Sequence, residues 1–211
     1  MKISDKVVLR KEEEKDYLNS EAMTREAFWN VYHPGCSEHF LITKIRLHES
    51  NIPELSIVAE VDGKLVGSIY YTESKLIFKD STQEYDIKVA TFGPLAVDPE
   101  YQNNGIGFML IKDTLLKAEE LGYKAIFIYG NPEYYGRFGF VNAEKYGIST
   151  EDGKNFDAFM CLELKKGALK GISGRLIESE VFKNINVEEL EEYDSKFPEK
   201  EKKILPGQLG V

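Results

Sequence analysis

The sequence contains few cysteines, no long apolar run and no excess of basic residues. Its two cysteines among 211 residues, Cys36 and Cys161, are too few for a disulfide framework, which favours a reducing cytoplasm. No apolar run approaches the roughly 20 residues of a membrane-spanning helix. Residues 1–6 also lack the apolar segment of a secretion signal. We therefore expect a soluble, cytoplasmic protein with no membrane partner.

Acidic residues outnumber basic residues by 36 to 27, and the formal net charge is -9. Such a balance disfavours nucleic acid and anionic membranes as partners, because both carry the same sign of charge. It does not exclude a local anion site, since backbone amides can form one without any basic side chain. The charge weakly favours a cationic small molecule or peptide as the second partner.

Two familiar phosphate-binding motifs are absent from residues 97–107, where an apolar strand is followed by glycines and a helix. Gly105-Ile106-Gly107 lacks the third glycine of a dinucleotide fingerprint, because that position is Leu110. No Gly-Lys-Ser or Gly-Lys-Thr sequence occurs anywhere in the chain, which excludes a Walker loop. The remaining interpretation is a pyrophosphate cradle at a helix start, formed by the amides of residues 103–107.

Periodicity and turn signals predict alternating helices and strands. Asp62-Gly63 indicates a hairpin turn, and Gly93-Pro94 should distort a strand in mid-course because proline removes a hydrogen-bond donor. Beyond residue 165 the pattern weakens, apart from an acidic helix at 187–193. The expected helices are 11–31, 37–48, 106–121 and 132–135, and the expected strands are 7–10, 56–61, 64–71, 86–97, 125–129, 138–141 and 157–164.

Two motifs together resemble the GNAT superfamily of N-acetyltransferases. Val97-x-Pro99-x-x-Gln102-x-x-Gly105-x-Gly107 is similar to the family's coenzyme A motif, with glutamine at 102 where many members have arginine. Residues 131–140, Asn-Pro-Glu-Tyr-Tyr-Gly-Arg-Phe-Gly-Phe, resemble its second signature. The resemblance covers residues 7–164. It implies an α/β (α+β) fold with a mixed, mostly antiparallel central sheet flanked by helices, and a strand pair splayed at the Gly-Pro bulge.

The pattern of elements predicts a domain division, and the resemblance implies a function. Residues 1–166 should form the acetyltransferase domain, and residues 167–211 a C-terminal extension that contains the acidic helix. The protein should be an acyltransferase that moves an acetyl group from acetyl-CoA directly to a primary amine, as a monomer or homodimer. The alternative is a non-catalytic acyl-CoA-binding sensor or interaction module.

The resemblance assigns roles to particular residues. The Leu95 amide should bond the acetyl carbonyl, and the proton donor to the departing thiolate should be Tyr135, with Tyr134 as the other candidate. Thus the catalytic candidates are Tyr135 and Leu95. The candidate cofactor-binding residues are Leu95, Ala96, Val97, Gln102, Asn103, Asn104, Gly105, Ile106, Gly107, Asn131 and Tyr134.

The sequence leaves the acceptor side open. A base should deprotonate the attacking amine, whose ordinary pKa is near 10.4, and the four carboxylates weighed are Glu60, Glu73, Glu84 and Asp86. Members of the family place the connection between the first two helices beside the acceptor, so His33 and His39 are expected there. With Cys36 they are also spaced for a metal, but a structural zinc site wants about four ligands, and we predict none.

Overall fold

The computed structural model describes residues 2–79, 81–183 and 185–208, and divides the chain into two compact units. Unit 1 comprises Met1–Tyr70, Pro94–Ile111 and Glu180–Val211, and unit 2 comprises Tyr71–Gly93 and Lys112–Ser179. The predicted extension therefore contributes to both units, and its last three residues, 209–211, lie outside the described part. No helix in the described ranges has the length and apolar composition needed to cross a membrane.

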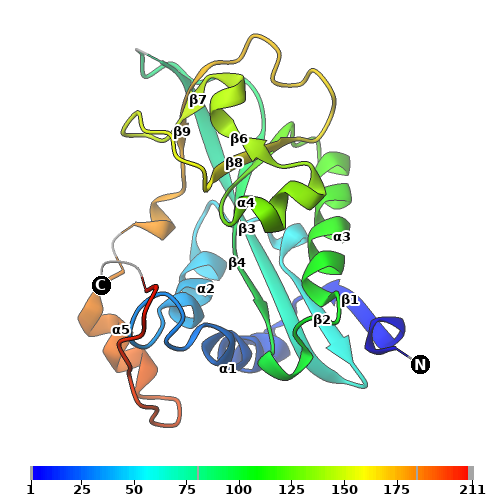
Figure 1. Ribbon diagram of the computed structural model, residues 1–211, viewed down its shortest axis with the longest axis vertical. Coiled ribbons are helices and arrows are strands. Elements are labelled where there is room, and N and C mark those ends of the chain that lie inside the picture. Colours follow the sequence, from blue (N-terminus) through cyan, green and yellow to red (C-terminus); the bar gives the residue numbers. More distant parts are fainter. Residues whose placement is uncertain (1, 80, 184, 209–211) are drawn as a thin grey trace. The chain divides into compact units, whose positions relative to one another are not determined.

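The strands form a mixed sheet in the order β1-β2-β3-β4-β5-β8-β6, with β9 paired to β3 and β7 paired to β9 (Figure 1). Two of the pairings, β4 with β5 and β7 with β9, are parallel, and the predicted mostly antiparallel sheet flanked by helices is confirmed. The strands are β1 Val7–Lys11, β2 Ile57–Val61, β3 Lys64–Phe78, β4 Val89–Val97, β5 Ala125–Tyr129, β6 Val141–Asn142, β7 Ile148–Ser149, β8 Phe159–Glu163 and β9 Gly174–Ile177. The α-helices are α1 Tyr17–Phe28, α2 Glu38–Leu47, α3 Ile106–Glu120, α4 Pro132–Tyr135 and α5 Val187–Asp194.

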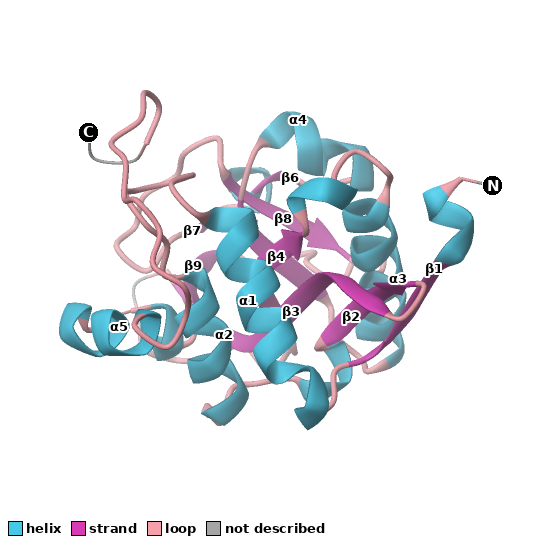
Figure 2. Ribbon diagram, turned by 90° about the horizontal axis from the view of Figure 1, so that it is seen from below, coloured by secondary structure: helices cyan, strands magenta, loops and turns pink. Residues whose placement is uncertain are grey.

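Unit 1 is built on the β2–β3 hairpin, with helices α1 and α2 beside each other (Figure 2). The turn residues Asp62 and Gly63 both have positive φ, 52° and 82°, as a tight hairpin requires. Met23 of α1 packs on Val58 and Leu65, which ties the helix to the hairpin. This packing buries the strands of the hairpin under the helices.

Gly67 lets the start of α3 approach the sheet in unit 1. A Cβ atom at Gly67 would lie 3.0 Å from Ile106, 3.1 Å from Leu110 and 3.3 Å from the carbonyl oxygen of Ala96. Both Ile106 and Leu110 are buried. The first turn of α3 is therefore held against β3 by close packing that a larger side chain would disturb.

Unit 2 has its own core between β5, β8 and β9. The stacked rings of Phe127 and Phe159 lie 6.0 Å apart at its centre. Strand β9 pairs Leu176 with Leu76 of β3, and Leu176 joins the same core. The sequence did not predict β9, because four residues are too few to show a period, and the strand is stabilised by its partners rather than by its own pattern.

The first helix begins six residues later than predicted, at Tyr17. Lys11 ends β1, and Glu13 and Asp16 form a capping turn in which the Glu13 amide donates to Asp16 at 2.8 Å. Glu12 is buried and accepts from Tyr70 at 2.6 Å. Charged residues at the start of the predicted helix 11–31 are therefore used in a turn and in the core.

Candidate functional site

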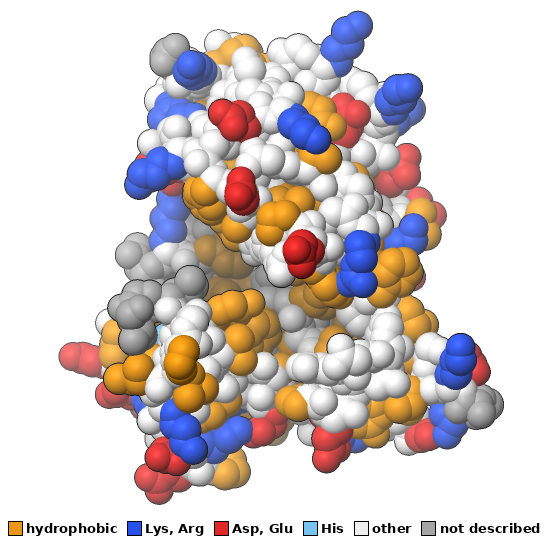
Figure 3. All heavy atoms as spheres, viewed as in Figure 1, with side chains coloured by type: hydrophobic (Ala, Val, Ile, Leu, Met, Phe, Trp, Pro, Cys, Tyr) orange, Lys and Arg blue, Asp and Glu red, His pale blue; other side chains and the backbone are white. Residues whose placement is uncertain are grey.

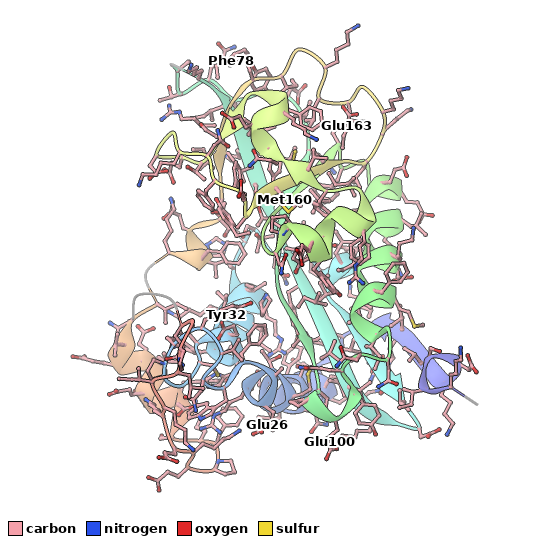
Figure 4. All side chains as sticks on the ribbon, in the orientation of Figure 1. Glu26, Tyr32, Phe78, Glu100, Met160 and Glu163 are labelled. Atoms are coloured by element: carbon pink, nitrogen blue, oxygen red, sulfur yellow. The ribbon has the colours of Figure 1, made fainter. Side chains whose placement is uncertain are left out.

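The joint between β4 and α3 is held by its own polar side chains. The Asp98 amide donates to the Val66 carbonyl at 2.9 Å, which anchors the joint to β3. The side-chain amide of Gln102 donates to the Val97 carbonyl at 3.1 Å, and that of Asn104 to the Gln102 carbonyl at 2.9 Å. Glu100, labelled in Figure 4, lies at this joint and is exposed. The predicted cofactor residues of 102–104 thus also shape the loop.

Positive φ angles at Asn103 and Gly105, 62° and 82°, turn the chain into α3. A Cβ atom at Gly105 would have no neighbour within 4 Å, and the residue is exposed. The first amides of a helix have no partner within it, and α3 is 15 residues long. Gly105, Ile106 and Gly107 therefore form an open, positively polarised helix start that suits an anionic group.

Strand β4 changes character at Gly93-Pro94. Its first four residues are all buried, whereas Leu95 and Val97 are half-buried and Ala96 between them is buried. The parallel register with β5 runs from Val89 to Thr91, whereas β5 continues to Tyr129 in its pairing with β8. The predicted splay of β4 from β5 requires that their hydrogen-bonded pairing ends before Gly93-Pro94. The splay itself stays a prediction.

Helix α4 presents the two candidate tyrosines in unit 2. Asn131 caps it by accepting from the Glu133 amide at 2.8 Å, so that side-chain oxygen is already used. The Tyr135 ring lies against Phe92, 5.8 Å between centroids, and crosses Gly130 so closely that any side chain there would clash. Glycine at 130 therefore makes room for the Tyr135 ring.

Tyr134 has a cation over its ring. The Arg137 guanidinium lies 4.4 Å from the ring centroid. Burial raises the pKa of Tyr134, and Arg137 opposes that rise. The two tyrosine rings meet edge to face at 5.0 Å, so the helix presents both phenols from one short turn.

Three of the four carboxylates weighed as acceptor bases are held by other side chains. Glu60 binds Arg10 at 2.5 Å, Glu73 accepts from the Tyr123 hydroxyl at 3.0 Å, and Glu84 binds Lys75 at 2.8 Å. Asp86 is exposed. Arg10 also pairs with Asp16, so Glu60 belongs to an ion-pair cluster at β1, which argues most strongly against Glu60.

The connection between α1 and α2 holds the His-Cys-His pattern. His39 is fully buried, 0% exposed, so it does not line an accessible acceptor site, whereas His33 is half-buried. The Cys36 sulfur lies 3.2 Å from Nδ1 of His39, and Nε2 of His39 lies 3.2 Å from Asp194 Oδ1. Burial raises the pKa of the Cys36 thiol to about 12, so it stays protonated and is a poor nucleophile.

Glu38 is a candidate that the sequence did not suggest. It is the first residue of α2, half-buried, and accepts from the Ser37 amide at 2.9 Å. Burial raises the pKa of Glu38, and the backbone amides of Glu38 and Ser37 oppose the rise. A carboxylate at a helix start reads as an ordinary capping residue, and its desolvation depends on tertiary packing, so no local signal indicated it.

We expect the buried imidazole of His39 to make unit 1 sensitive to acid. Burial lowers the pKa of His39 to about 4 from 6.5, with Asp194 opposing and Arg25 adding to the effect. Between pH 6.5 and 4, His39 therefore binds a proton in the unfolded chain but not in the folded chain. Stability contributed by the neutral ring is complete above pH 6.5 and is lost as the pH falls through that range.

Urea unfolding midpoints at pH 7.0 and pH 5.0 test this expectation. The difference between the two midpoints should shrink in His39→Gln. His48→Gln is the matched control, because His48 is only half-buried and follows the last residue of the same helix. An equal difference in the parent and in His39→Gln would contradict the assignment.

Comparison with known proteins defines the class of this fold and site. Residues 20–140 match the family model described as "Acetyltransferase (GNAT) family". That match spans more than half of the chain, and the protein therefore belongs to the GNAT family and is an acyltransferase enzyme.

Relatives from Escherichia coli K12 support the same placement. The chain is 30% identical over 129 residues to "Uncharacterized N-acetyltransferase YhbS", covering 61% of this chain and 74% of the relative. It is 35% identical over 100 residues to "Uncharacterized N-acetyltransferase YjhQ", covering 47% of this chain and 53% of the relative. Both are described as N-acetyltransferases without a stated acceptor.

Two solved structures share the fold. The Escherichia coli YhbS protein in complex with CoA aligns with a TM-score of 0.74 and 25% identity, over 86% of this chain and 94% of that one. A GNAT family acetyltransferase from Brucella melitensis in complex with acetyl-CoA aligns with a TM-score of 0.64 and 25% identity, over 83% and 97%.

Proposed function

We propose that the protein transfers an acetyl group from acetyl-CoA directly to a primary amine. The observation that carries this proposal is the open start of α3, where Gly105 is exposed at φ 82° and a Cβ atom would meet nothing within 4 Å. The CoA and acetyl-CoA complexes of two similar proteins support the identity of the donor. The residues of the joint fit a pyrophosphate, because a Cβ atom at Gly105 would occupy otherwise empty space.

Backbone amides rather than basic side chains would hold the donor. The amides of Asn103 to Gly107 lie at the N-terminal end of a 15-residue helix, where the helix dipole is positive. On the face drawn in Figure 3, the lysine and arginine side chains of the described residues are spread over the surface among acidic, apolar and other side chains. Binding of the donor should therefore depend only modestly on salt.

Leu95 and Tyr135 would serve the chemical step. The Leu95 amide, two residues beyond Gly93, would stabilise the oxyanion that forms on the acetyl carbonyl, a contribution of roughly 3 kcal/mol. Ala96 and Val97 would continue along the donor with their backbone. Tyr135, or otherwise Tyr134, would give a proton to the departing thiolate, with Asn131 placing their helix.

Acceptor recognition would use unit 1 at the α1–α2 connection. Glu38 there combines a desolvated carboxylate with the neighbouring half-buried His33. A carboxylate with a raised pKa can accept a proton from the attacking amine more readily than an exposed one. The net charge of -9 favours cationic amines over neutral ones.

The other proposals concern organisation. We place the acetyltransferase domain at residues 1–166 and the extension at 167–211, and we place the protein in the cytoplasm as a monomer or homodimer. The two thiols, both buried and free of a disulfide in the structure, support a reducing compartment. Nucleic acid is not among the proposed partners because of the acidic charge.

Thiol release from acetyl-CoA tests the proposed reaction. We expect free CoA to appear above the amine-free rate with at least one member of a panel of ethanolamine, phenethylamine, spermidine and a lysine-containing peptide. A thiol-reactive dye follows the release, and mass spectrometry identifies the acetylated amine. If CoA binds in calorimetry but no amine in a broadened panel raises the rate, direct transfer to an amine is wrong.

A further inference from the structure

The chain after α5 crosses back to the connection between α1 and α2. We call residues 194–208 the strap. Over these described residues, the chain after Asp194 contains turns and irregular backbone but no helix or strand. Figure 1 draws it in red and orange beside the blue α1–α2 connection, and hydrogen bonds join the two. Both segments belong to unit 1.

Asp194 forms the first attachment of the strap. Its carboxylate accepts from Arg25 at 2.7 and 3.2 Å. Arg25 is only 2% exposed, and its guanidinium also lies 4.1 Å from the centre of the Trp29 ring. A buried guanidinium needs its partner, because an unpaired buried charge is costly. The strap therefore supplies the counter-charge for a residue of α1.

Asn30 forms the second attachment and uses both ends of its side chain. Its Oδ1 accepts from the Gly35 amide at 2.8 Å and from the Lys203 amide at 3.0 Å. Its Nδ2 donates to the Glu201 carbonyl at 3.0 Å. Asn30 also has φ 60°, in the left-handed region that asparagine tolerates better than most residues. The Asn30 side chain thus bonds to Gly35 within the loop and to Glu201 and Lys203 of the strap.

The strap also reaches the loop through Gln208 and through the loop tryptophan. Gln208 is 5% exposed and donates to the Asn30 carbonyl at 2.9 Å. The Trp29 indole donates to the same Glu201 carbonyl at 3.0 Å. Most of these bonds involve backbone atoms of irregular chain, which remain in one conformation only when such partners are present.

The loop held in this way exposes side chains suited to recognition. Val31 and Tyr32 are 47% and 45% exposed, and the Phe28 and Tyr32 rings lie 5.9 Å apart. Tyr32 is labelled in Figure 4. Glu38 follows at the start of α2. Burial of Tyr32 raises the pKa of its phenol, and the negative charge of Glu38 adds to that rise. Apolar surface beside a desolvated carboxylate matches an amine that carries an apolar body.

We propose that the strap is a positioning element for the acceptor, with Asn30 as its central positioning residue and an amine with an apolar body as the substrate class. This inference rests on one part of the proposed function, namely that the acceptor binds at the connection between α1 and α2. Fixing the loop in advance lowers the entropy cost of binding the acceptor. Binding of the donor at the start of α3 does not involve the strap's hydrogen bonds.

Substitutions on both sides of the attachment test the proposal. Asn30→Gly keeps the left-handed backbone but removes three side-chain bonds, and Gln208→Ala removes the bond from the strap side. We expect each to raise the acceptor KM about 10-fold, as the loss of about 1.4 kcal/mol would, with CoA affinity within about 2-fold of the parent. Phenethylamine and ethanolamine are the probe amines, and the first should be affected more. Asn30→Asp keeps the two accepted bonds and should lie between parent and Asn30→Gly.

Hydrogen exchange supplies a readout that needs no turnover. Amides of residues 30–36 should exchange faster in Asn30→Gly and in Gln208→Ala but not in Asn155→Gly, an exposed control. Unchanged exchange in Gln208→Ala, or unchanged acceptor KM in a variant whose loop has become mobile, would overturn the proposal. If the parent binds no CoA and acetylates nothing, the proposed function fails instead, and the exchange data still decide whether the strap holds the loop.

Discussion

Gly105→Val is expected to weaken CoA binding about 100-fold. The valine side chain would enter the empty space over the first amides of α3, where the pyrophosphate should lie. Loss of one or two hydrogen bonds to a charged group, worth about 1.5–3 kcal/mol each, corresponds to this factor. Titration calorimetry with CoA measures it directly.

The chain provides a matched control for the backbone strain. Gly153 has φ 81° against 82° for Gly105, is also exposed, and would likewise carry a Cβ atom with no neighbour within 4 Å. A β-branched residue at such a φ costs roughly 1–3 kcal/mol wherever it stands. Gly153→Val should therefore lose similar stability and keep its CoA affinity. Equal losses of affinity in both variants would place the phosphates elsewhere.

Tyr135→Phe is expected to lower kcat about 50-fold with little change in CoA affinity. The phenol would give its proton to a thiolate, a leaving group that departs fairly well unaided, so the loss should lie near or below the usual lower limit of about 100-fold for general acids. Phenylalanine keeps the ring contacts with Phe92 and Phe140 that hold the side chain. The rate at saturating amine and acetyl-CoA measures this loss, because it equals kcat.

Tyr134→Phe separates the two tyrosines. Tyr134 lies on the same short helix, 5.0 Å from the Tyr135 ring, and its ring is covered by Arg137. We expect this variant to keep kcat within about 3-fold of the parent, since its ring packing is retained. A large loss in Tyr134→Phe with none in Tyr135→Phe would reverse the assignment of the acid.

The elements that could be predicted from sequence are those whose cause is local. Asp62-Gly63 specifies a tight turn by its own backbone preferences, and both residues have the expected positive φ. The helix predicted at 106–121 spans Ile106–Glu120, because its apolar residues repeat at helical spacing. The proposed anion-binding role of the joint likewise rests on a glycine and a helix start that are adjacent in the chain.

The elements that were missed depend on distant partners. Strand β9 exists through its pairing with β3 and β7, and Glu12 leaves the predicted helix to bind Arg46 and Tyr70. His39 was expected beside the acceptor but is buried beside Cys36 and Asp194. In each case a long-range contact outweighs the local preference.

By itself the sequence determined the family, the donor and the joint between β4 and α3, because the Val97 to Gly107 motif and the open helix start are contiguous. Only the tertiary structure decided how the connection between α1 and α2 is held by the strap. Trp29 and Glu201 are 172 positions apart, and Asn30 and Lys203 are 173 apart. Any residue type can supply the backbone carbonyl of Glu201 or the backbone amide of Lys203. The residue types at these positions therefore do not predict the hydrogen bonds, and only the folded structure shows the strap.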